Sequence, residues 1–203
     1  MRSQRNRASL GAVFSLLVLF TAVLAAPASA APVAARVAAT PVPAAPAPPP
    51  APIGPDGVRV QGSWSGPYTY RNFHSGKCLD MSGTAEGAAA VQRQCLAGHS
   101  SQAWYEWFYM GDGSVAYFLI SNGFTGQCIT GIHGRGVALW QQPCYEVEHQ
   151  TWIRTVANMN QYTNEMTSLC MEVGGWATHD GAIVMSWDCL GNPNQLWSKF
   201  GWH

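Results

Sequence analysis

An internal repeat that occurs three times constrains the fold of this chain more than any other sequence feature. Each copy has an Asn six residues before a first Cys, then a run from Gly to a second Cys, and then a Gln-x-Trp triplet. The opening segments are Asn72–Cys78, Asn122–Cys128 and Asn164–Cys170, the middle segments are Gly87–Cys95, Gly136–Cys144 and Gly181–Cys189, and the triplets are Gln102–Trp104, Gln150–Trp152 and Gln195–Trp197. Because all three registers recur in the same order, the sequence predicts three copies of one supersecondary unit.

The local pattern inside each copy predicts short β-strands. Runs with strand character are separated by Gly, Asn and Asp turns, and no stretch shows a long helical period. These runs are Tyr68–Arg71, Tyr117–Ile120, Val137–Trp140 and Ile183–Trp187. The expected fold class is therefore all-β.

The N-terminal 30 residues have the layout of an export signal. Arg2, Arg5 and Arg7 precede an apolar stretch from Leu10 to Ala25, and small residues follow at Ala28–Ala30. This arrangement predicts a signal peptide over residues 1–30 and a secreted, extracellular protein, with an uncleaved N-terminal anchor as the alternative.

A Pro/Ala-rich segment separates the signal from the repeats. Residues 31–56 are almost wholly Ala, Pro and Val, and the prolines deny the segment helix and sheet hydrogen bonds. We expect a disordered, semi-rigid linker there. The folded domain then covers residues 57–203, with repeats at about 66–110, 115–156 and 157–203.

All six cysteines lie in the repeats, one pair to each copy. In an exported protein they are expected to form disulfides. The sequence alone allows several connectivities, and only the repeat favours Cys78–Cys95, Cys128–Cys144 and Cys170–Cys189. No Cys-x-x-Cys or paired-His motif is present, so we expect no metal and no cofactor.

The charge balance argues against nucleic acid as a partner. The chain has 11 basic and 11 acidic residues, and cleavage of the signal removes three of the basic ones, which leaves a net charge of about −3. A faintly acidic domain without a basic run is a poor partner for nucleic acid or an anionic membrane.

The Cys-Leu-Asp run at Cys78–Asp80, the Gln-x-Trp triplets and the paired cysteines together resemble the ricin B-type lectin family, over about Ser63 to Trp202. The resemblance implies a β-trefoil, in which three four-stranded repeats surround a pseudo-threefold axis. It also implies a glycan or polysaccharide ligand, with galactose-type glycans, xylan and arabinan as candidates. The Trp of each triplet is then expected in the core, and the Gln is expected to tie down backbone or a loop.

The resemblance also implies where sugar would bind. The family has a carboxylate two residues after the first Cys, an aromatic residue two before the second Cys, and an Asn just before the Gln. In the third repeat these positions hold Glu172, Trp187, Asn194 and Gln195. The loop residues Trp176 and His179 are expected to add a second wall to that site.

The other two repeats depart from this pattern. The first repeat keeps Asp80 and Gln102 as possible secondary binding residues, but Arg93 replaces the aromatic residue and Ser101 replaces the Asn. Arg93 could pair with Asp80 and close the site, or could bind an acidic sugar. The second repeat has no carboxylate or stacking residue at these positions, which hold Thr130, Gln142 and His149. Trp140 lies two residues from the stacking position.

No catalytic motif is present, and we expect no enzyme activity, although Asp180 and Asp188 leave a glycosidase pair open. The expected function is a carbohydrate-binding lectin module. The alternative is a trefoil with degenerate sugar sites that docks a protein, as an inhibitor or a toxin-delivery subunit.

Overall fold

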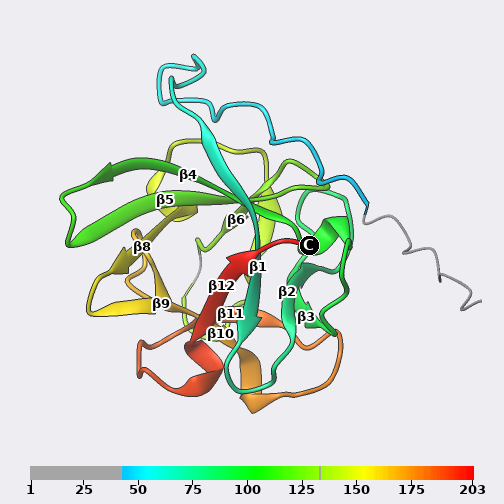
Figure 1. The fold of residues 1–203 in the computed structure, drawn as a ribbon. Helices are drawn as coiled ribbons and strands as arrows, with labels where there is room; N and C mark the ends of the chain where they lie inside the picture. Colours follow the sequence, from blue (N-terminus) through cyan, green and yellow to red (C-terminus); the bar gives the residue numbers. More distant parts are fainter. Residues whose placement is uncertain (1–42, 133) are drawn as a thin grey trace, which may run out of the picture. The chain divides into compact units, whose positions relative to one another are not determined.

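A computed structural model describes residues 43–132 and 134–203. Over this range the chain forms short strands joined by turns and single-turn 3-10 helices (Figure 1). The strands are β1 (Trp64–Asn72), β2 (Cys78–Met81), β3 (Ala90–Arg93), β4 (Trp104–Gly111), β5 (Val115–Asn122), β6 (Cys128–Thr130), β7 (Trp140–Gln142), β8 (Thr151–Thr155), β9 (Asn158–Asn164), β10 (Cys170–Val173), β11 (Val184–Trp187) and β12 (Trp197–Gly201). The 3-10 helices are η1 (Ser100–Gln102), η2 (Glu148–Gln150), η3 (Gly174–Trp176) and η4 (Pro193–Gln195). No helix in the described residues is both long and apolar enough to cross a lipid bilayer.

Six strands form a barrel, and six form three hairpins. The antiparallel pairs β12–β1, β1–β4, β4–β5, β5–β8 and β8–β9 build the barrel wall, and a bridge between Gln161 and Leu196 joins its two ends. The hairpins are β2–β3, β6–β7 and β10–β11. Single bridges join each hairpin to the next: Ala89 to Trp140, Ala138 to Met185, and Val91 to Ile183. This is the β-trefoil that the family resemblance implies, with one unit of four strands from each sequence repeat.

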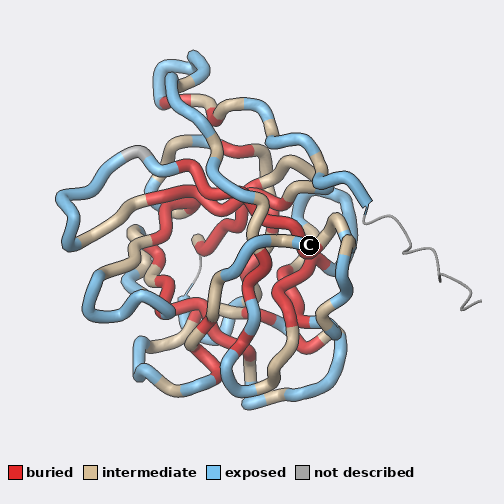
Figure 2. The backbone as a smooth tube through the Cα atoms, viewed as in Figure 1, coloured by how far each residue is buried: buried red, intermediate tan, exposed pale blue. Residues whose placement is uncertain are grey.

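The core lies inside the barrel and under the hairpins (Figure 2). Trp104, Trp152 and Trp197, one from each triplet, are fully buried there, which confirms their expected place. Each indole Nε1 donates to the backbone carbonyl of the residue after the first Cys of its own repeat, at 3.0–3.2 Å. A buried Trp needs such an acceptor, and here the acceptor holds the hairpin onto the barrel.

An Asn at the first turn of each repeat ties that repeat to the one before it. The Asn72, Asn122 and Asn164 side chains each accept hydrogen bonds from backbone N–H groups two or three residues further on. Their Nδ2 groups donate to the carbonyl of the residue before the triplet Gln of the preceding repeat, at 2.7–3.0 Å. The predicted turn is therefore also the joint between neighbouring units.

Charged side chains close one end of the barrel. Glu106, Arg154 and Lys199 occupy the same position, two residues after the triplet Trp, in the three repeats. Lys199 Nζ donates to Glu106 at 2.6 Å, Arg154 lies 3.7 Å from the same carboxylate, and the Tyr70 hydroxyl donates to it. Three symmetry-related positions thus hold three different residues that satisfy one another, as buried charges require.

All three disulfides form within repeats. Cys78 pairs with Cys95, Cys128 with Cys144 and Cys170 with Cys189, each with Cα atoms 5.0 Å apart. The connectivity favoured by the repeat is confirmed. Each bridge joins the start of a hairpin to the segment that follows it.

The strap, residues 43–56, differs from the expected disordered linker. The remainder of that linker and the predicted signal peptide lie outside the described residues. The Ile53 N–H donates to Cys144 O at 3.0 Å, and Ile53 O accepts from Glu146 N at 2.8 Å. The Tyr105 hydroxyl donates to Pro46 O, and Ala51 packs against a second apolar cluster, which includes Trp107 and Leu119. Proline carbonyls remain good acceptors although the residue has no N–H, so the strap binds through carbonyl oxygens as well as through the Ile53 N–H.

We expect removal of the strap to destabilise the trefoil. A chain that begins at Gly57 loses the two backbone hydrogen bonds of Ile53 and the packing of Ala51. Its free energy of unfolding should therefore be about 2–3 kcal/mol lower than that of a chain beginning at Pro43. Urea denaturation followed by Trp fluorescence measures the difference. Tyr105→Phe removes one strap hydrogen bond and should lower stability by about 1 kcal/mol. Equal midpoints for the two chains would show that the strap is not part of the fold.

Candidate functional site

The β10–β11 hairpin of the third repeat carries a carboxylate and an indole on one face. Cys170 pairs with Trp187 and Glu172 pairs with Met185 in the strand register. Side chains alternate along a strand, so Glu172 and Trp187 lie on the same face and are diagonal neighbours. Diagonal neighbours are within reach of long and aromatic side chains. The two residues can therefore contact one small ligand.

Buried amides hold the Glu172 carboxylate in place. Glu172 is 6% exposed, and its Oε2 accepts from Gln195 Nε2 at 2.6 Å. Burial raises the pKa of this carboxyl above its ordinary value, and the nearby Asp188 charge adds to that rise. Hydrogen bonds from Gln195 and Asn194 oppose it by favouring the charged form.

Gln195 positions this carboxylate and has no free donor to offer a sugar. Besides Glu172, its Nε2 donates to Asp188 O at 2.6 Å, and its Oε1 accepts from the N–H groups of Leu190 and Gly191. Both amide hydrogens are donated and the amide oxygen accepts two backbone hydrogen bonds, so nearly all of the hydrogen-bonding capacity of this side chain is used. Gln195 is fully buried and holds the carboxylate, and its expected direct contact with sugar stays a prediction.

Asn194 is likewise buried, at 1% exposure. Its Nδ2 donates to Val173 O at 3.1 Å. Its Oδ1 accepts no hydrogen bond from any described residue. A buried acceptor without a donor costs free energy, which a water molecule or a ligand hydroxyl at this place would relieve.

Trp187 lies outside the core and is half-buried. The Arg135 guanidinium sits 5.6 Å from the centre of its ring and pairs with Asp188 at 2.6 Å. Gly136 backs the same indole closely: a Cβ on this glycine would meet the ring at 3.3 Å. Residues of the second repeat therefore pack against the Trp187 ring, and this contact was not predicted from the sequence.

Arg135 reaches Trp187 because each hairpin loop crosses to the following repeat. The loop of the first repeat supplies Gly83 and Ala85 carbonyls to Gln141 of the second. The loop of the second repeat places Arg135 and Gly136 on the third. The pattern repeats because the three hairpins meet at one axis.

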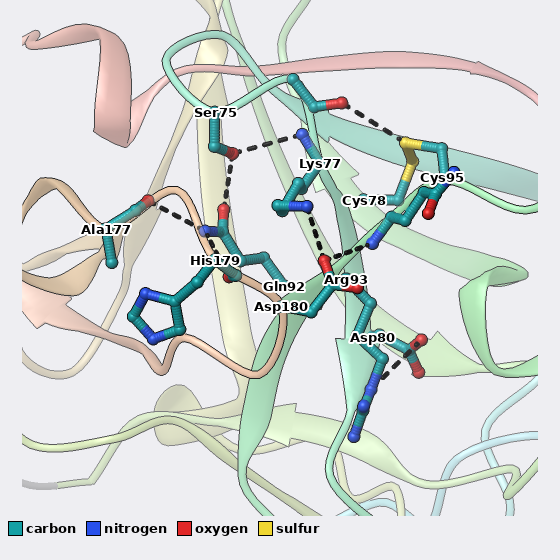
Figure 3. Close-up of polar contacts among 12 residues, drawn as sticks. Ser75, Lys77, Cys78, Asp80, Gln92, Arg93, Cys95, Ala177, His179 and Asp180 are labelled. Atoms are coloured by element: carbon teal, nitrogen blue, oxygen red, sulfur yellow. Dashed lines mark hydrogen bonds and ion pairs between the residues drawn. A yellow bond between two sulfur atoms is a disulfide. The ribbon is translucent and has the colours of Figure 1, made fainter.

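By the same rule, Trp176 and His179 lie against the first repeat and not against Trp187. Trp176 O lies 3.1 Å from His74 Nε2, and the two rings meet edge to face with centroids 4.9 Å apart. Gln92 Nε2 donates to the carbonyls of Ala177 and His179 (Figure 3). The contacts of Trp176 and His179 are thus with the first repeat, and their expected role as a second wall of the third-repeat site stays a prediction.

The first repeat has the same frame with different chemistry. Asp80 is 1% exposed, and its Oδ2 accepts from Gln102 Nε2 at 3.1 Å, as Glu172 does from Gln195. Gln102 is buried and also bonds Gln94 O and Leu96 N, so it too is a positioning residue. Arg93 Nε lies 3.8 Å from Asp80 Oδ2, which is an ion pair beyond hydrogen-bond distance.

The second repeat keeps the frame without a charge. Gln150 Nε2 donates to Thr130 Oγ1 at 3.1 Å, so a hydroxyl replaces the carboxylate. Thr130 is fully buried and pairs in register with Trp140. Burial lowers the pKa of His149, which lines a pocket of about 580 Å³ with Glu146, Glu148 and Pro55 of the strap. The described residues contain no group of three or more His, Cys, Asp or Glu side chains placed to hold a metal ion.

Comparisons with known proteins agree with this fold. The profile of the ricin-type beta-trefoil lectin domain family matches residues 116–201. A designed threefold-symmetric protein, ThreeFoil, superposes with a TM-score of 0.59 at 24% identity, over 66% of this chain and 98% of its own. A search of curated proteins found no match to the sequence.

Two larger proteins contain a similar portion. An exo-beta-1,3-galactanase from Clostridium thermocellum superposes with a TM-score of 0.60 at 26% identity, and the hemolytic lectin CEL-III with 0.54 at 25%. Each match covers 70% of this chain but only 32% and 31% of those chains. The chain therefore spans about a third of either protein. Its profile match over residues 116–201 and its three-repeat fold make the described domain similar to the ricin-type β-trefoil lectin domain family.

Proposed function

We propose that the domain binds carbohydrate through a shallow site on its third repeat. The observation that carries this proposal is that the Glu172 carboxylate and the half-buried Trp187 indole lie as diagonal neighbours on one hairpin face. Gln195 occupies one carboxylate oxygen, and an ionised carboxylate has further acceptor positions for sugar hydroxyls. The indole covers the apolar C–H face of a pyranose ring.

A single site of this kind binds weakly. A hexose has about 12 heavy atoms, and about −0.3 kcal/mol for each gives roughly −4 kcal/mol, or a millimolar Kd. Useful retention therefore needs a longer glycan or clustered display. Galactose-type glycans, xylan and arabinan are the first ligands to test.

Secretion is part of the same proposal. Three disulfides within one small domain suit an oxidising compartment. The signal-like residues 1–30 supply the route. Detection of a chain cleaved after Ala30 in culture medium would test it.

A protein-docking role is the second candidate. Three exposed apolar side chains, Phe108, Val156 and Met159, line one pocket of about 210 Å³ near the barrel end. Clustered exposed apolar side chains commonly mark contact surfaces. A domain that retains none of the tested glycans would favour this protein-docking role over carbohydrate binding.

The first prediction from this proposal concerns the stacking residue, Trp187. Trp187→Ala removes the apolar face and should weaken glycan retention by about tenfold, because stacking supplies on the order of 1 kcal/mol beyond area burial. Affinity electrophoresis in gels that contain each polysaccharide measures it. Trp176→Ala removes an exposed indole that contacts the first repeat and is the matched control. Unchanged retention by the Trp187 variant would contradict a site on the third repeat.

The second prediction concerns Glu172. A carboxyl with a higher pKa in the folded protein than in the unfolded chain binds its proton more tightly when folded, so the fold loses stability as pH rises through the ordinary carboxyl range. Glu172→Gln removes this loss. Its unfolding free energy relative to the parent should increase from about pH 3 to pH 7, while glycan retention at pH 7 falls. Urea denaturation across that range measures the first effect, with the exposed Glu86→Gln variant as the charge control. A relative stability that declines with pH would show that the folded protein favours the charged carboxylate.

The third prediction concerns hydrolysis. Asp180 pairs with Lys77 at 2.6 Å and Asp188 pairs with Arg135, so each is committed to an ion pair with a different repeat. A glycosidase pair needs two carboxylates that flank one glycosidic bond, and two carboxylates paired with cations of different repeats do not favour that arrangement. We expect no reducing sugar from a panel of polysaccharides incubated with the purified chain. Release that disappears in Asp188→Asn would establish an enzyme instead.

A further inference from the structure

The first and third repeats enclose a pocket of about 430 Å³ beside Asp80. Its walls are Asp80 and Arg93 from the β2–β3 hairpin, Gln94, His99 and Ser101 from the following segment, and Asp180 from the third-repeat loop. This volume falls in the range of small-molecule sites. Figure 3 shows Arg93, Asp80 and Asp180 gathered at the junction of the two repeats.

Both carboxylates of this pocket already have partners. Asp80 accepts from Met81 N at 2.7 Å and from Gln102 Nε2 at 3.1 Å. Asp180 accepts from Lys77 Nζ at 2.6 Å and from Gln94 N at 2.9 Å. The hydrogen bond from Lys77 is the main reason that the pKa of Asp180 lies below its ordinary value. Local donors therefore satisfy the negative charges.

The guanidinium of Arg93 is left with unused donors. Its nearest carboxylate oxygen, on Asp80, is 3.8 Å from Nε, and its side chain is 44% exposed. Among the residues that the structure describes, no hydrogen-bond acceptor takes a proton of this guanidinium. A planar guanidinium has five N–H groups in a fork that fits a carboxylate in two parallel hydrogen bonds.

Arg93 stands where the third repeat has its stacking residue. Arg93 pairs in register with Cys78 as Trp187 pairs with Cys170, so the two side chains occupy equivalent places on their hairpins. A neutral sugar would lose its stacking face in the first repeat. A sugar that carries a carboxylate would gain charge-assisted hydrogen bonds in return.

We propose that the first-repeat pocket binds an acidic sugar, with the carboxylate of a hexuronate residue on Arg93. Ser101 Oγ and His99 Nδ1, which lie 2.8 Å apart on the pocket wall, face the ring hydroxyls. This inference rests on the proposed carbohydrate-binding function. It gives the two hairpin sites different ligands, a neutral glycan on Trp187 and an acidic one on Arg93.

The test is to titrate the full chain with galacturonate and, separately, with galactose. Two-dimensional amide NMR spectra monitor each titration. Galacturonate should shift the backbone amides of Met81 and Gln94, and galactose should shift the Trp187 indole. Arg93→Gln should weaken galacturonate binding about five- to tenfold, and Arg93→Lys less so, because an ammonium keeps the charge without the fork. Added salt should weaken galacturonate binding and leave galactose binding unchanged.

Matched controls separate this proposal from the function on which it rests. Trp187→Ala should weaken the galactose response by about tenfold and leave the galacturonate response intact, and the unperturbed amides report whether each variant is folded. If no sugar shifts the NMR signal of the Trp187 indole, the proposed binding site on the third repeat is wrong, and the proposal for the first repeat is unaffected. An Arg93→Gln variant that admits galactose into the pocket would overturn the proposal, because Arg93 would then close the site. Acetate that matches galacturonate in affinity would overturn it as well, since the pocket would then recognise an anion without a sugar.

Discussion

The trefoil depends on one buried side chain used three times, the Gln of the Gln-x-Trp triplet. The same two backbone groups bind each triplet Gln, Gln102, Gln150 and Gln195. The side-chain oxygen accepts from the N–H of the residue just after the second Cys, and the side-chain nitrogen donates to the carbonyl of the residue just before that Cys. The second amide hydrogen of each reaches the side chain two residues after the first Cys. A buried amide that lost any of these partners would cost free energy. The loop, the disulfide and the candidate ligand position are therefore held by the same group.

This shared frame lets the three sites diverge without loss of the fold. The Gln needs only an acceptor at its second hydrogen, and the carboxylates of Asp80 and Glu172 and the hydroxyl of Thr130 all serve. The residue two positions before the second Cys makes no hydrogen bond to this Gln. It is Arg93 in the first repeat and Trp187 in the third. Binding chemistry can change at that position while the backbone stays in place.

Neighbouring repeats complete one another's surfaces. Arg135 and Gly136 of the second repeat brace Trp187 of the third, and Asp180 of the third walls the pocket of Arg93. The barrel end follows the same principle, because Glu106 is neutralised by Lys199 and Arg154 from the other two units. One isolated repeat would leave buried charges and incomplete candidate sites, so the fold and the candidate sites both require all three repeats.

The sequence by itself determined the threefold repeat and most of the strand runs, although the run expected at Val137–Trp140 is observed at Trp140–Gln142. The repeat favoured the disulfide pairing that the structure has. Periodicity and local spacing carry that information, because each such feature lies within one unit. The family resemblance, and not the periodicity, implied that the three triplet Trp residues lie in the core. The family resemblance selected Glu172 and Trp187 as candidate site residues, and the structure places both on one hairpin face. Only the tertiary structure decided the partners of Trp176, Arg135 and Arg93 and the docking of the strap on Cys144. Those contacts join segments far apart in the chain, and their geometry is set by how three units close around a common axis, which no local pattern encodes.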